Sequence, residues 1–440
     1  MILSGWGNYP RAETRVLDTA GTDATLAVLR AEESLIARGN GRSYGDAALN
    51  PRATLSMLQS RRVIDFDPAR GIITCEAGAM LSDLIDLVLP QGWFPPVTPG
   101  TRFVTIGGMI AADVHGKNHH SGGAFGDYVE AFDLALADAT VVRCARDENA
   151  ALFAATRGGM GLTGIILTAT FRLVPIETAH IRQETHRAAN LREVMDLFEA
   201  KNDWTYSVAW IDCLARGASL GRSLLYLGEH ARRDELPDGT DPALRRVARK
   251  TRRVPFYFPE IALNPWSVRA FNELYFRRGR PGQAIVDYET YFYPLDALLE
   301  WNRIYGRSGF VQYQCVLPPD ASVVGMTAIL ERAGRAGSGS FLAVLKLFGA
   351  AADAPLSFPM AGYTLALDFR ATPAVMQLLV EFDAIVHDHG GRVYLAKDAR
   401  MGAADFRRGY PQLGEFMAVR EQADPAGRFT SAQSERLGMR

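Results

Sequence analysis

The sequence predicts an α+β protein of two domains, and three observations carry that prediction. The chain has 440 residues, enough for two separate hydrophobic cores. Roughly the first 175 residues alternate short apolar runs with three glycine-rich loops. The later part has longer runs that alternate apolar and polar residues, with helical segments between them, as is typical of an antiparallel sheet backed by helices. We expect a cofactor-binding first domain over which a sheet domain closes.

Apolar spacing and turn residues predict the elements in chain order. In the first domain we expect a strand over 34–37, a hairpin of 63–66 and 72–75, a helix over 80–89 that ends at Pro90, and a strand over 165–173. In the second we expect strands over 206–211, 223–227, 310–316, 341–348 and 363–369, and helices over 191–200 and 375–387.

Composition excludes several classes of function. The net charge of −1 gives no overall field for nucleic acid or anionic lipid, so a basic partner surface would have to be local. Four widely spaced cysteines, without a C-x-x-C pair, predict reduced buried thiols rather than a disulfide framework or a zinc knuckle. The start of the chain has no leader pattern, and no apolar run reaches membrane-spanning length. We expect a cytoplasmic protein.

Two of the glycine-rich stretches predict a ligand site. Residues 38–46 hold three glycines, which permit close backbone approach to a ligand, but they match neither a P-loop nor the Rossmann spacing. In 99–120, an extended piece meets Gly107-Gly108 and then a small-residue run, 109–112, of helical composition. Uncovered backbone N–H groups at such a junction suit a diphosphate, and an ordinary glycine turn is the alternative.

Polar residues on otherwise apolar strands predict a second part of the site. Gln312 and Gln314 share one strand face, which is either a polar pocket wall or a solvent-facing sheet surface. Lys346 lies among Leu, Val and Phe, and either reaches out to solvent or points into a ligand site. Lys397 follows the apolar run 393–396, which we expect to be a strand, and a desolvated lysine there can act as a base or orient an oxygen.

Two further stretches invite a functional interpretation. The histidines 115, 119 and 120 are not aligned on one helix, because Gly116 interrupts it, so we expect no metal site and assign His115 to a ligand contact. The segment 232–276 becomes basic and then aromatic between 245 and 259. It is either a solvated helix face with a packed loop, or an interfacial lid that contacts anionic headgroups or a substrate phosphate.

Seven motifs in one order carry a family resemblance that spans nearly the whole chain. They are G-N-G-R-S-Y-G-D (39–46), P-G-T-R-F-V-T-I-G-G (99–108), D-V-H-G-K-N-H-H (113–120), G-M-G-L-T-G-I-I (159–166), F-V-Q-Y-Q (310–314), L-K-L-F-G (345–349) and Y-L-A-K-D-A-R (394–400). With these motifs the chain resembles the FAD oxidoreductases of the vanillyl-alcohol-oxidase (PCMH) type, and within them the polyprenyl-phosphoryl ribose 2′-oxidases.

The resemblance implies the fold and the cofactor. It implies a two-domain PCMH-type FAD-binding fold in which residues 1–175 bind FAD, an antiparallel-sheet substrate domain (176–391, with the lid 232–276) is inserted, and 392–440 return to the FAD domain. Because the first loop has no histidine, the FAD is expected to be non-covalent. The expected FAD contacts are Arg38, Gly39, Asn40, Gly41, Arg42, Ser43, Tyr44, Pro99, Gly100, Thr101, Thr105, Gly107, Gly108, His115, Gly116, Asn118, His119, Gly161, Ile165 and Tyr394.

The resemblance also implies a reaction. The 2′-hydroxyl of a polyprenyl-phosphoryl ribose would be oxidised to a ketone by hydride transfer to flavin N5, and a separate NAD(P)H-dependent short-chain reductase would complete the epimerisation to arabinose. The positions that match the family's active site are Lys397, Gln314, Gln312, Lys346, His115 and Tyr44. The protein is expected to be cytoplasmic, with possible peripheral contact at the inner membrane surface. We expect no nucleic-acid partner.

The chain departs from the family pattern at three positions, where it has Thr364, Ala366 and Phe292 instead of an asparagine, a cysteine and a tyrosine. A thiol that is absent at Ala366 cannot be essential to the reaction, and the changes bear on which sugar or lipid is bound. Two alternatives stay open at this point: an alditol or aldonolactone oxidase that uses oxygen, and a non-catalytic flavin-binding scaffold of a glycan pathway.

Overall fold

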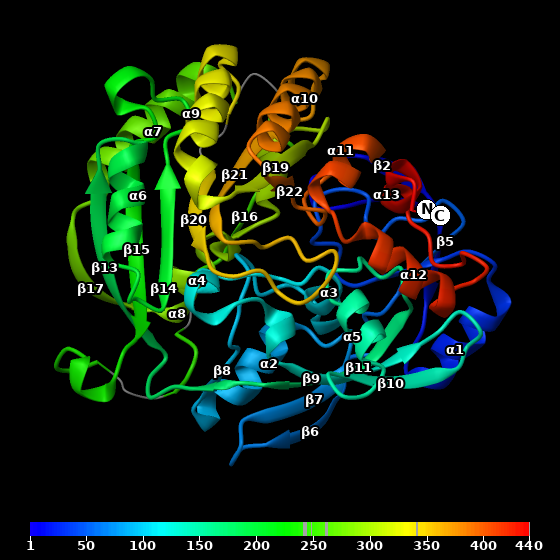
Figure 1. The fold of residues 1–440 in the computed structure, drawn as a ribbon. Coiled ribbons are helices and arrows are strands. Elements are labelled where there is room, and N and C mark those ends of the chain that lie inside the picture. Colours follow the sequence, from blue (N-terminus) through cyan, green and yellow to red (C-terminus); the bar gives the residue numbers. More distant parts are fainter. Residues whose placement is uncertain (241–243, 248, 260–262, 340–341, 440) are drawn as a thin grey trace.

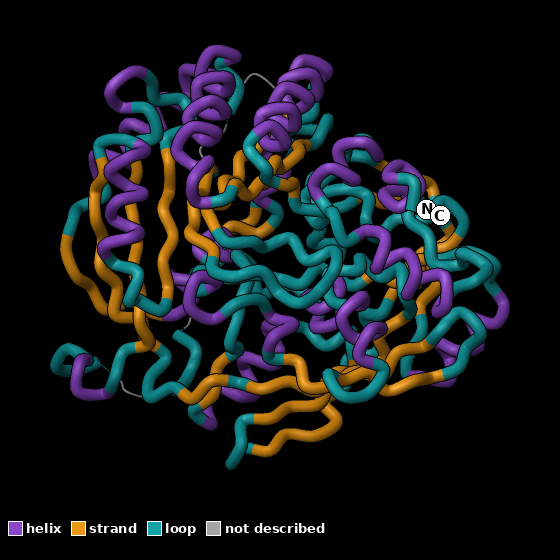
Figure 2. Tube along the Cα trace, in the orientation of Figure 1, coloured by secondary structure: helices purple, strands orange, loops and turns teal. Residues whose placement is uncertain are grey.

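The computed structural model of the chain, shown in Figure 1, describes residues 1–240, 244–247, 249–259, 263–339 and 342–439. Two large antiparallel sheets dominate it. One is built from strands of the first 175 residues, and the other from strands between residues 180 and 393. Figure 2 shows the longer strands of the second sheet standing beside the loop-rich first part of the chain.

The first large sheet has five strands in the order β10-β9-β11-β7-β6. Their bounds are β6 Val63–Asp67, β7 Ile72–Glu76, β9 Val129–Ala135, β10 Val141–Ala145 and β11 Ile165–Arg172. Phe94, Phe125, Phe132 and Phe171 are buried in the hydrophobic core of this part. Each such phenyl group contributes about 1.5–3 kcal/mol by leaving water, so this core can hold the glycine-rich loops above it in place.

A smaller parallel sheet, β3-β5-β4, is formed by β3 Arg15–Asp18, β4 Ile36–Arg38 and β5 Ala53–Ser56. In the part of the chain that the structure describes, three two-stranded ribbons accompany these sheets. They pair β1 Ile2–Ser4 with β2 Arg11–Glu13, β8 Trp93–Phe94 with β12 Val174–Pro175, and β16 Arg252–Arg253 with β18 Leu298–Leu299.

The second large sheet has eight strands in the order β17-β13-β15-β14-β20-β21-β19-β22, and all its pairs are antiparallel. The bounds are β13 His180–Ala188, β14 Tyr206–Ile211, β15 Ser223–His230, β17 Gly282–Asp287, β19 Phe310–Leu317, β20 Ala343–Phe348, β21 Gly362–Arg370 and β22 Arg392–Val393.

Helices α6 Leu191–Ala200, α9 Pro319–Ala336 and α10 Pro373–Asp388 cover one face of this sheet (Figure 1). Their buried residues, among them Phe198, Met326 and Phe382, share one core with Tyr313 and Cys315 of β19. Because side chains alternate along a strand, the neighbours of these β19 residues project from the opposite face, away from the helices. That face is where the site lies.

The remaining helices are short or flank the two sheets. They are α1 Thr22–Ala31, α2 Leu81–Val88, α3 Ile106–Ala111, α4 His119–Gly122, α5 Ala150–Thr156, α7 Pro265–Arg278, α8 Tyr288–Phe292, α11 Ala403–Gly409, α12 Leu413–Ala423 and α13 Ala432–Leu437. After β22 the chain returns to the first part, where Phe429 forms a bridge with Leu35 (Figure 1).

Most of the elements predicted from the sequence are present. The hairpin, the helix at 81–88 and the strands of the second half are confirmed with shifts of a few residues, and 191–200 and 206–211 match in full. The four cysteines are free and buried, as expected. Residue 341 of the predicted strand 341–348 lies outside the described residues, as do 241–243, 248 and 260–262 of the predicted lid.

Three predictions of local structure are wrong. Gly107 and Gly108 do not precede a helix but form its first turn, because Thr105 caps α3 by accepting a hydrogen bond from the Gly108 N–H at 3.3 Å. Residues 393–396 form no extended strand, since β22 ends at Val393. The basic run 245–253 forms no helix in its described residues, and its last two arginines form the strand β16 instead.

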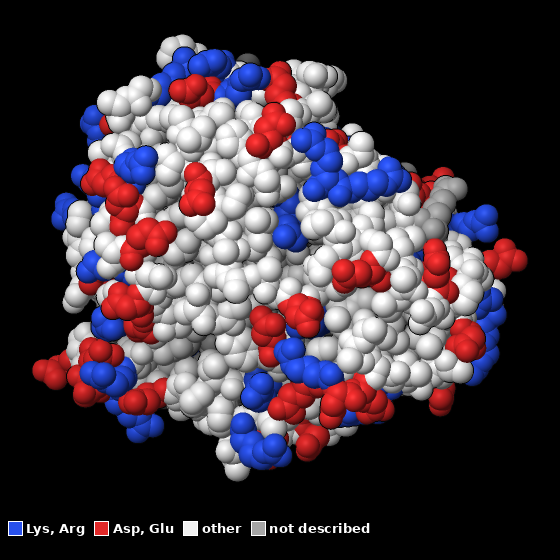
Figure 3. Space-filling model, in the orientation of Figure 1, with Lys and Arg blue, Asp and Glu red and all other residues white. Residues whose placement is uncertain are grey.

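Charge on the face seen in Figure 3 is mixed, with basic and acidic side chains interspersed around a largely uncharged centre. Among the described residues, no helix is long and apolar enough to cross a bilayer.

Candidate active site

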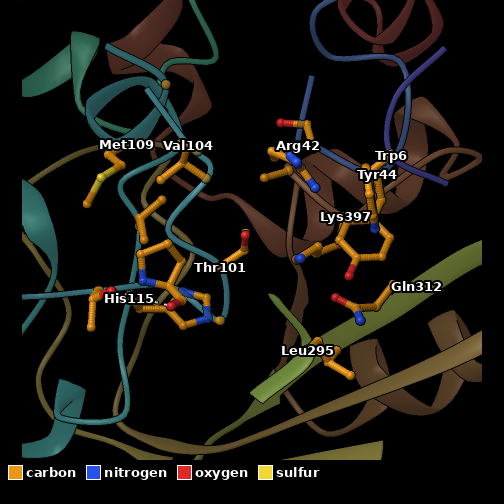
Figure 4. Close-up of a pocket in the computed structure, with 18 of the residues that line it drawn as sticks. Trp6, Arg42, Tyr44, Thr101, Val104, Met109, His115, Leu295, Gln312 and Lys397 are labelled. Atoms are coloured by element: carbon orange, nitrogen blue, oxygen red, sulfur yellow. Dashed lines mark hydrogen bonds between the residues drawn. The ribbon is translucent and has the colours of Figure 1, made fainter. Parts of the chain in front are cut away.

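A cavity of about 970 Å³ lies between the glycine-rich loops and the uncovered face of the eight-stranded sheet. Figure 4 shows Lys397, Tyr44 and Gln312 clustered on one side of it, opposite His115, Val104 and Met109. This volume is at the upper end of the range for small-molecule sites, so the cavity has room for a large ligand. It is mostly apolar, with convergent cationic and amide groups at one part of its wall.

The structure brings nearly all the predicted site residues to this one cavity. All six predicted catalytic residues line it. Of the other predicted cofactor contacts, those that line the cavity are Arg38, Gly39, Asn40, Gly41, Arg42, Ser43, Pro99, Gly100, Thr101, Thr105, Gly107, Gly108, Gly161 and Tyr394.

Four predicted cofactor contacts do not line the cavity, and each has another role. Gly116 packs against Asn118, whose amide donates to the Pro96 carbonyl at 2.9 Å. The ring of His119 packs on Phe348, and its Nδ1 accepts from a backbone N–H. Ile165 is buried in the core beneath the parallel sheet. These residues shape the segment behind the cavity instead of its surface.

Close packing of backbone segments determines the shape of the loop side of the cavity. A Cβ on Gly39 would lie 2.1 Å from Thr105 Oγ1, which is the oxygen that caps α3. Gly41 has φ of +63°, a conformation that L-residues with a side chain rarely adopt. Asn40 fixes the two loops to each other by donating from its amide to the Phe103 carbonyl at 2.9 Å. Glycine is therefore required at the point where the first loop meets α3.

The sheet side of the cavity follows from strand register. Gln312 and Gln314 of β19 lie opposite Asp368 and Ala366 of β21, and Lys346 of β20 lies opposite Thr364. Because cross-strand partners project from the same face, these polar groups converge although they come from three strands. Of the two interpretations given above for Gln312 and Gln314, the pocket wall is correct, and Lys346 points into the cavity.

Lys397 lies among an aromatic ring, a carboxylate and a second lysine. Its Nζ lies 3.7 Å from the centre of the Tyr44 ring, a cation–π contact. Burial lowers the pKa of Lys397 to about 7, an effect that the Asp368 carboxylate opposes and Lys346 reinforces. Asp368 accepts a hydrogen bond from Gln312 Nε2 at 2.5 Å, and burial raises its pKa to about 7. The lysine can thus lose or hold a proton near neutral pH.

Two more buried lysines line the cavity, and an anionic ligand would favour their charged forms. Burial lowers the pKa of Lys346 to about 8. Burial, reinforced by Lys346, lowers the pKa of Lys117 to about 7, and its ammonium group lies 4.2 Å from the centre of the Tyr291 ring and donates to the Tyr291 carbonyl. An anionic ligand would relieve the mutual repulsion of these groups.

His115 is a neutral ring at the junction of loop and sheet. Burial, together with the neighbouring Lys346, His119 and Lys397, lowers its pKa well below the usual histidine range. Its Nε2 lies 3.0 Å from Gln314 Nε2 and therefore accepts from that amide, which fixes the tautomer with the proton on Nδ1. The Nδ1 of His115 is buried and has no hydrogen-bond partner among the described residues, so an acceptor atom of a ligand would satisfy it.

Sequence reasoning missed several residues that shape the site. Trp6 lines the cavity and stacks under Arg42, with the guanidinium 4.1 Å from its ring centre. Lys117 lies within a quoted motif, but its burial depends on α8, which is distant in the sequence. Asp368 is in a predicted strand, and its period-two spacing from Thr364 and Ala366 was a signal that could have found it.

The residues present fit a cofactor that is large and carries a diphosphate. Three glycine loops leave backbone exposed, Arg42, Lys117 and Lys346 supply positive charge, and His115 offers an unpaired N–H. Among the described residues, no three His, Cys, Asp or Glu side chains are placed to hold a metal ion. Together with the two-sheet fold, these features suit a nucleotide cofactor of the size of FAD.

Comparison with known proteins gives the family. Residues 18–145 match the FAD binding domain, and residues 364–437 match the D-arabinono-1,4-lactone oxidase domain. The chain is 38% identical to the decaprenylphosphoryl-β-D-ribose oxidase of Mycolicibacterium smegmatis, over 99% of this chain and 97% of that protein. It is 24% identical to bovine L-gulonolactone oxidase, over 91% of this chain and 88% of that protein.

The chain therefore belongs to the decaprenylphosphoryl-β-D-ribose oxidase family of FAD-dependent oxidoreductases. Its cofactor is FAD, and it is an enzyme. The expectation of a PCMH-type FAD oxidoreductase is confirmed, and the non-catalytic scaffold is set aside.

Proposed function

We propose that this enzyme oxidises the 2′-hydroxyl of a polyprenyl-phosphoryl ribose to the 2′-ketone. The observation that carries the proposal is the group formed by Lys397, Tyr44 and Gln312 in a cavity that also holds Lys346 and Lys117. A proton acceptor with a pKa near neutrality lies beside amide groups suited to hydroxyls and cations suited to a phosphate. The most similar named relative given above is an oxidase of such a substrate.

Lys397 is the catalytic base in this proposal. In its neutral form the amine accepts the proton of the sugar hydroxyl, and the hydrogen on the same carbon leaves with an electron pair. FAD, when bound, supplies the acceptor for that hydride. Burial raises the pKa of Tyr44 well above its ordinary value, so the phenol stays protonated and keeps the lysine on one face of its ring.

Of the other predicted active-site residues, Gln312, Gln314 and Lys346 position the substrate, and His115 orients one of them. Gln312 is held by Asp368, which leaves its carbonyl oxygen for a sugar hydroxyl. Gln314 is oriented by His115 and by Thr364, to whose hydroxyl its Nε2 donates at 3.1 Å. Lys346, in its charged form, is suited to the substrate phosphate. Substrate binding and proton transfer are thus assigned to different residues, so the two functions can be tested separately.

The glycine-rich loops would hold the FAD. The exposed backbone at Gly39, Gly41, Gly107 and Gly108 allows close approach of a diphosphate, and Arg42, which belongs to the first of these loops and lines the cavity, carries the opposite charge. The domain limits 1–175, 176–391 and 392–440 follow the resemblance and stay a prediction. Non-covalent binding of the FAD also stays a prediction.

The apolar part of the cavity suits a prenyl chain. It is lined by Trp210, Tyr226, Val286, Leu298 and Ile304. A free sugar would leave this surface in contact with water, whereas an isoprenoid would cover it. The product ketone calls for a second enzyme that returns a hydride to it, and we propose a separate NAD(P)H-dependent short-chain reductase on the cytoplasmic side.

The proposal is tested by the visible spectrum of the anaerobic protein before and after addition of a short-chain polyprenyl-phosphoryl ribose. Loss of the oxidised flavin bands is the expected result. An unchanged spectrum with that sugar, in a protein whose flavin is reduced by dithionite, would contradict the assignment of the substrate.

A second candidate is a lactone or alditol oxidase that uses oxygen. The match of residues 364–437 to D-arabinono-1,4-lactone oxidase and the similarity to L-gulonolactone oxidase favour it. Sustained peroxide formation with a free aldonolactone, and none with the lipid-linked sugar, would decide for this candidate.

A further inference from the structure

Helix α7 exposes an unusual set of large apolar side chains. It begins with Asn264, whose side chain caps the first turn, and Pro265, and only Val268 and Asn272 are buried. Trp266 is 78% exposed, and Phe271, Leu274 and Tyr275 are exposed as well. A helix on a water-facing surface ordinarily carries polar residues at such positions. This set, together with Arg277 and Arg278 in the last turn, is called the α7 surface below.

The α7 surface is continuous with the cavity. Phe271 and Tyr275 line the cavity and are exposed to solvent at the same time, so the cavity opens beside this helix. Tyr275 is held there by Trp210, with ring centres 4.8 Å apart, and by the Tyr226 hydroxyl at 3.1 Å. The apolar part of the cavity therefore leads to an apolar patch on the outside of the protein.

The stretch of sequence that contains α7 is strongly basic. Residues 245–280 contain ten Lys and Arg against two Glu, a net charge of +8. The other residues hold 38 basic and 47 acidic side chains, a net charge of −9, which together give the −1 of the whole chain. A second basic element also borders the cavity, since β16, which is Arg252–Arg253, pairs with β18, whose Leu298 lines it.

We propose that the α7 surface docks on an anionic lipid bilayer, with Trp266 and Leu274 in the interface and Arg277 and Arg278 at the headgroups. This rests on the proposed function, because a prenyl chain could then pass from the bilayer into the cavity beside Phe271 without crossing water. A second copy of the chain fits the surface poorly, because two strongly basic segments would face each other. An anionic bilayer complements both the apolar and the charged parts.

The test is sedimentation of the FAD-loaded protein with phosphatidylcholine vesicles, with and without phosphatidylglycerol. Each cation near an anionic surface strengthens partitioning by about fivefold. The double variant Arg277→Gln/Arg278→Gln should thus bind anionic vesicles roughly 25-fold more weakly. Glu273 keeps its pair with Arg222 at 2.7 Å in this variant, so the helix retains an anchor.

The apolar half of the proposal is tested by Trp266→Ser/Leu274→Ser, which should weaken binding by at least about tenfold. The matched control is Val324→Ser/Val380→Ser, which removes two exposed apolar side chains from α9 and α10 and should bind like the wild type. Equal binding to neutral and anionic vesicles, binding that all the variants share, or self-association without vesicle binding would each overturn the proposal.

The flavin assay separates this proposal from the proposed function. A water-soluble short-chain substrate should reduce the flavin of the α7 variants at the wild-type rate, because no α7 side chain changed here contacts the sugar. Reduction without vesicle binding in the wild type would refute the docking surface alone, and vesicle binding without reduction would refute the substrate alone.

Discussion

The two walls of the cavity are built on different principles. The loop wall, from residues 38–48 and 98–112, is made of glycines and tightly packed backbone, and Gly39 and Thr105 leave no room between them for a side chain. The sheet wall is made of polar side chains on β19, β20 and β21, whose positions follow from strand register, and Lys397 of the C-terminal segment faces two of them, Asp368 and Lys346. One wall presents fixed backbone groups, and the other presents groups that can titrate.

This difference indicates which ligand each wall is suited to bind. Backbone N–H groups have fixed direction and no accessible pKa, so they suit a resident cofactor. Lysine and glutamine side chains can release a proton or reorient, so they suit a substrate that must be bound, changed and released. Substitutions in the two walls should therefore fail in different ways.

The largest effect is expected from Lys397→Met, which keeps the length of the side chain but removes the amine. Loss of a general base should slow flavin reduction by about 10²–10⁴-fold, while the FAD content stays that of the wild type. In the wild type the rate should rise with pH through about 7, because burial lowers the pKa of Lys397 to about 7 and only the neutral amine accepts a proton. The variant should lose this rise. Stopped-flow reduction across pH 5–9 is the measurement.

Two outcomes would contradict the division of functions between the two walls. If Lys397→Met lost its FAD, the residue would serve the cofactor and not the sugar. If its slow reaction kept the wild-type pH profile, another group would be the base.

A smaller effect is expected from Gly39→Ala in the loop wall. The new methyl group would displace Thr105 Oγ1 and the α3 cap, and loss of a cap costs about 0.5–2 kcal/mol. FAD should therefore bind more weakly and thermal unfolding should occur at lower temperature, both measured by flavin fluorescence on heating. Gly414→Ala on α12, where a Cβ meets nothing within 4 Å, is the control and should retain both properties. Tight FAD in Gly39→Ala would show that this contact does not form the cofactor wall.

Sequence periodicity predicted that the two glutamines share a strand face, but it left open whether that face was a pocket wall or a solvent-facing surface. Alternation along 310–316 placed Gln312 and Gln314 on one face, and the structure confirms it because a strand has only two faces. The two-domain flavoprotein fold came from the resemblance, because glycine loops alone were compatible with ordinary turns. The start of α3 was wrong by three residues, since the Thr105 cap outweighed the unfavourable helix propensity of two glycines.

Residues that reach the site through long-range packing could not be predicted. Lys117 is buried against Tyr291, and Trp6 stacks with Arg42, contacts that depend on how distant segments fold together. Local patterns carry no information on such pairs. For the same reason the basic run 245–253 had the composition of a helix face, yet its end forms β16 against β18.

The smallest effect on the reaction is expected from Ala366→Cys, and it tests the register of the sheet wall. Ala366 lies opposite Gln314 and lines the cavity, whereas Leu367, the next residue on β21, is buried in the core on the other face. A thiol at 366 should therefore react with a maleimide, and should be protected by bound substrate, while a thiol in Leu367→Cys should not react. The four native cysteines are buried, so they give little background. The rate of flavin reduction should change little in Ala366→Cys, because an alanine methyl has no group to offer the reaction. Equal labelling at 366 and 367 would mean that β21 does not present its alternate residues to the cavity, and the convergence of Gln314, Lys346 and Asp368 would then lack its physical basis.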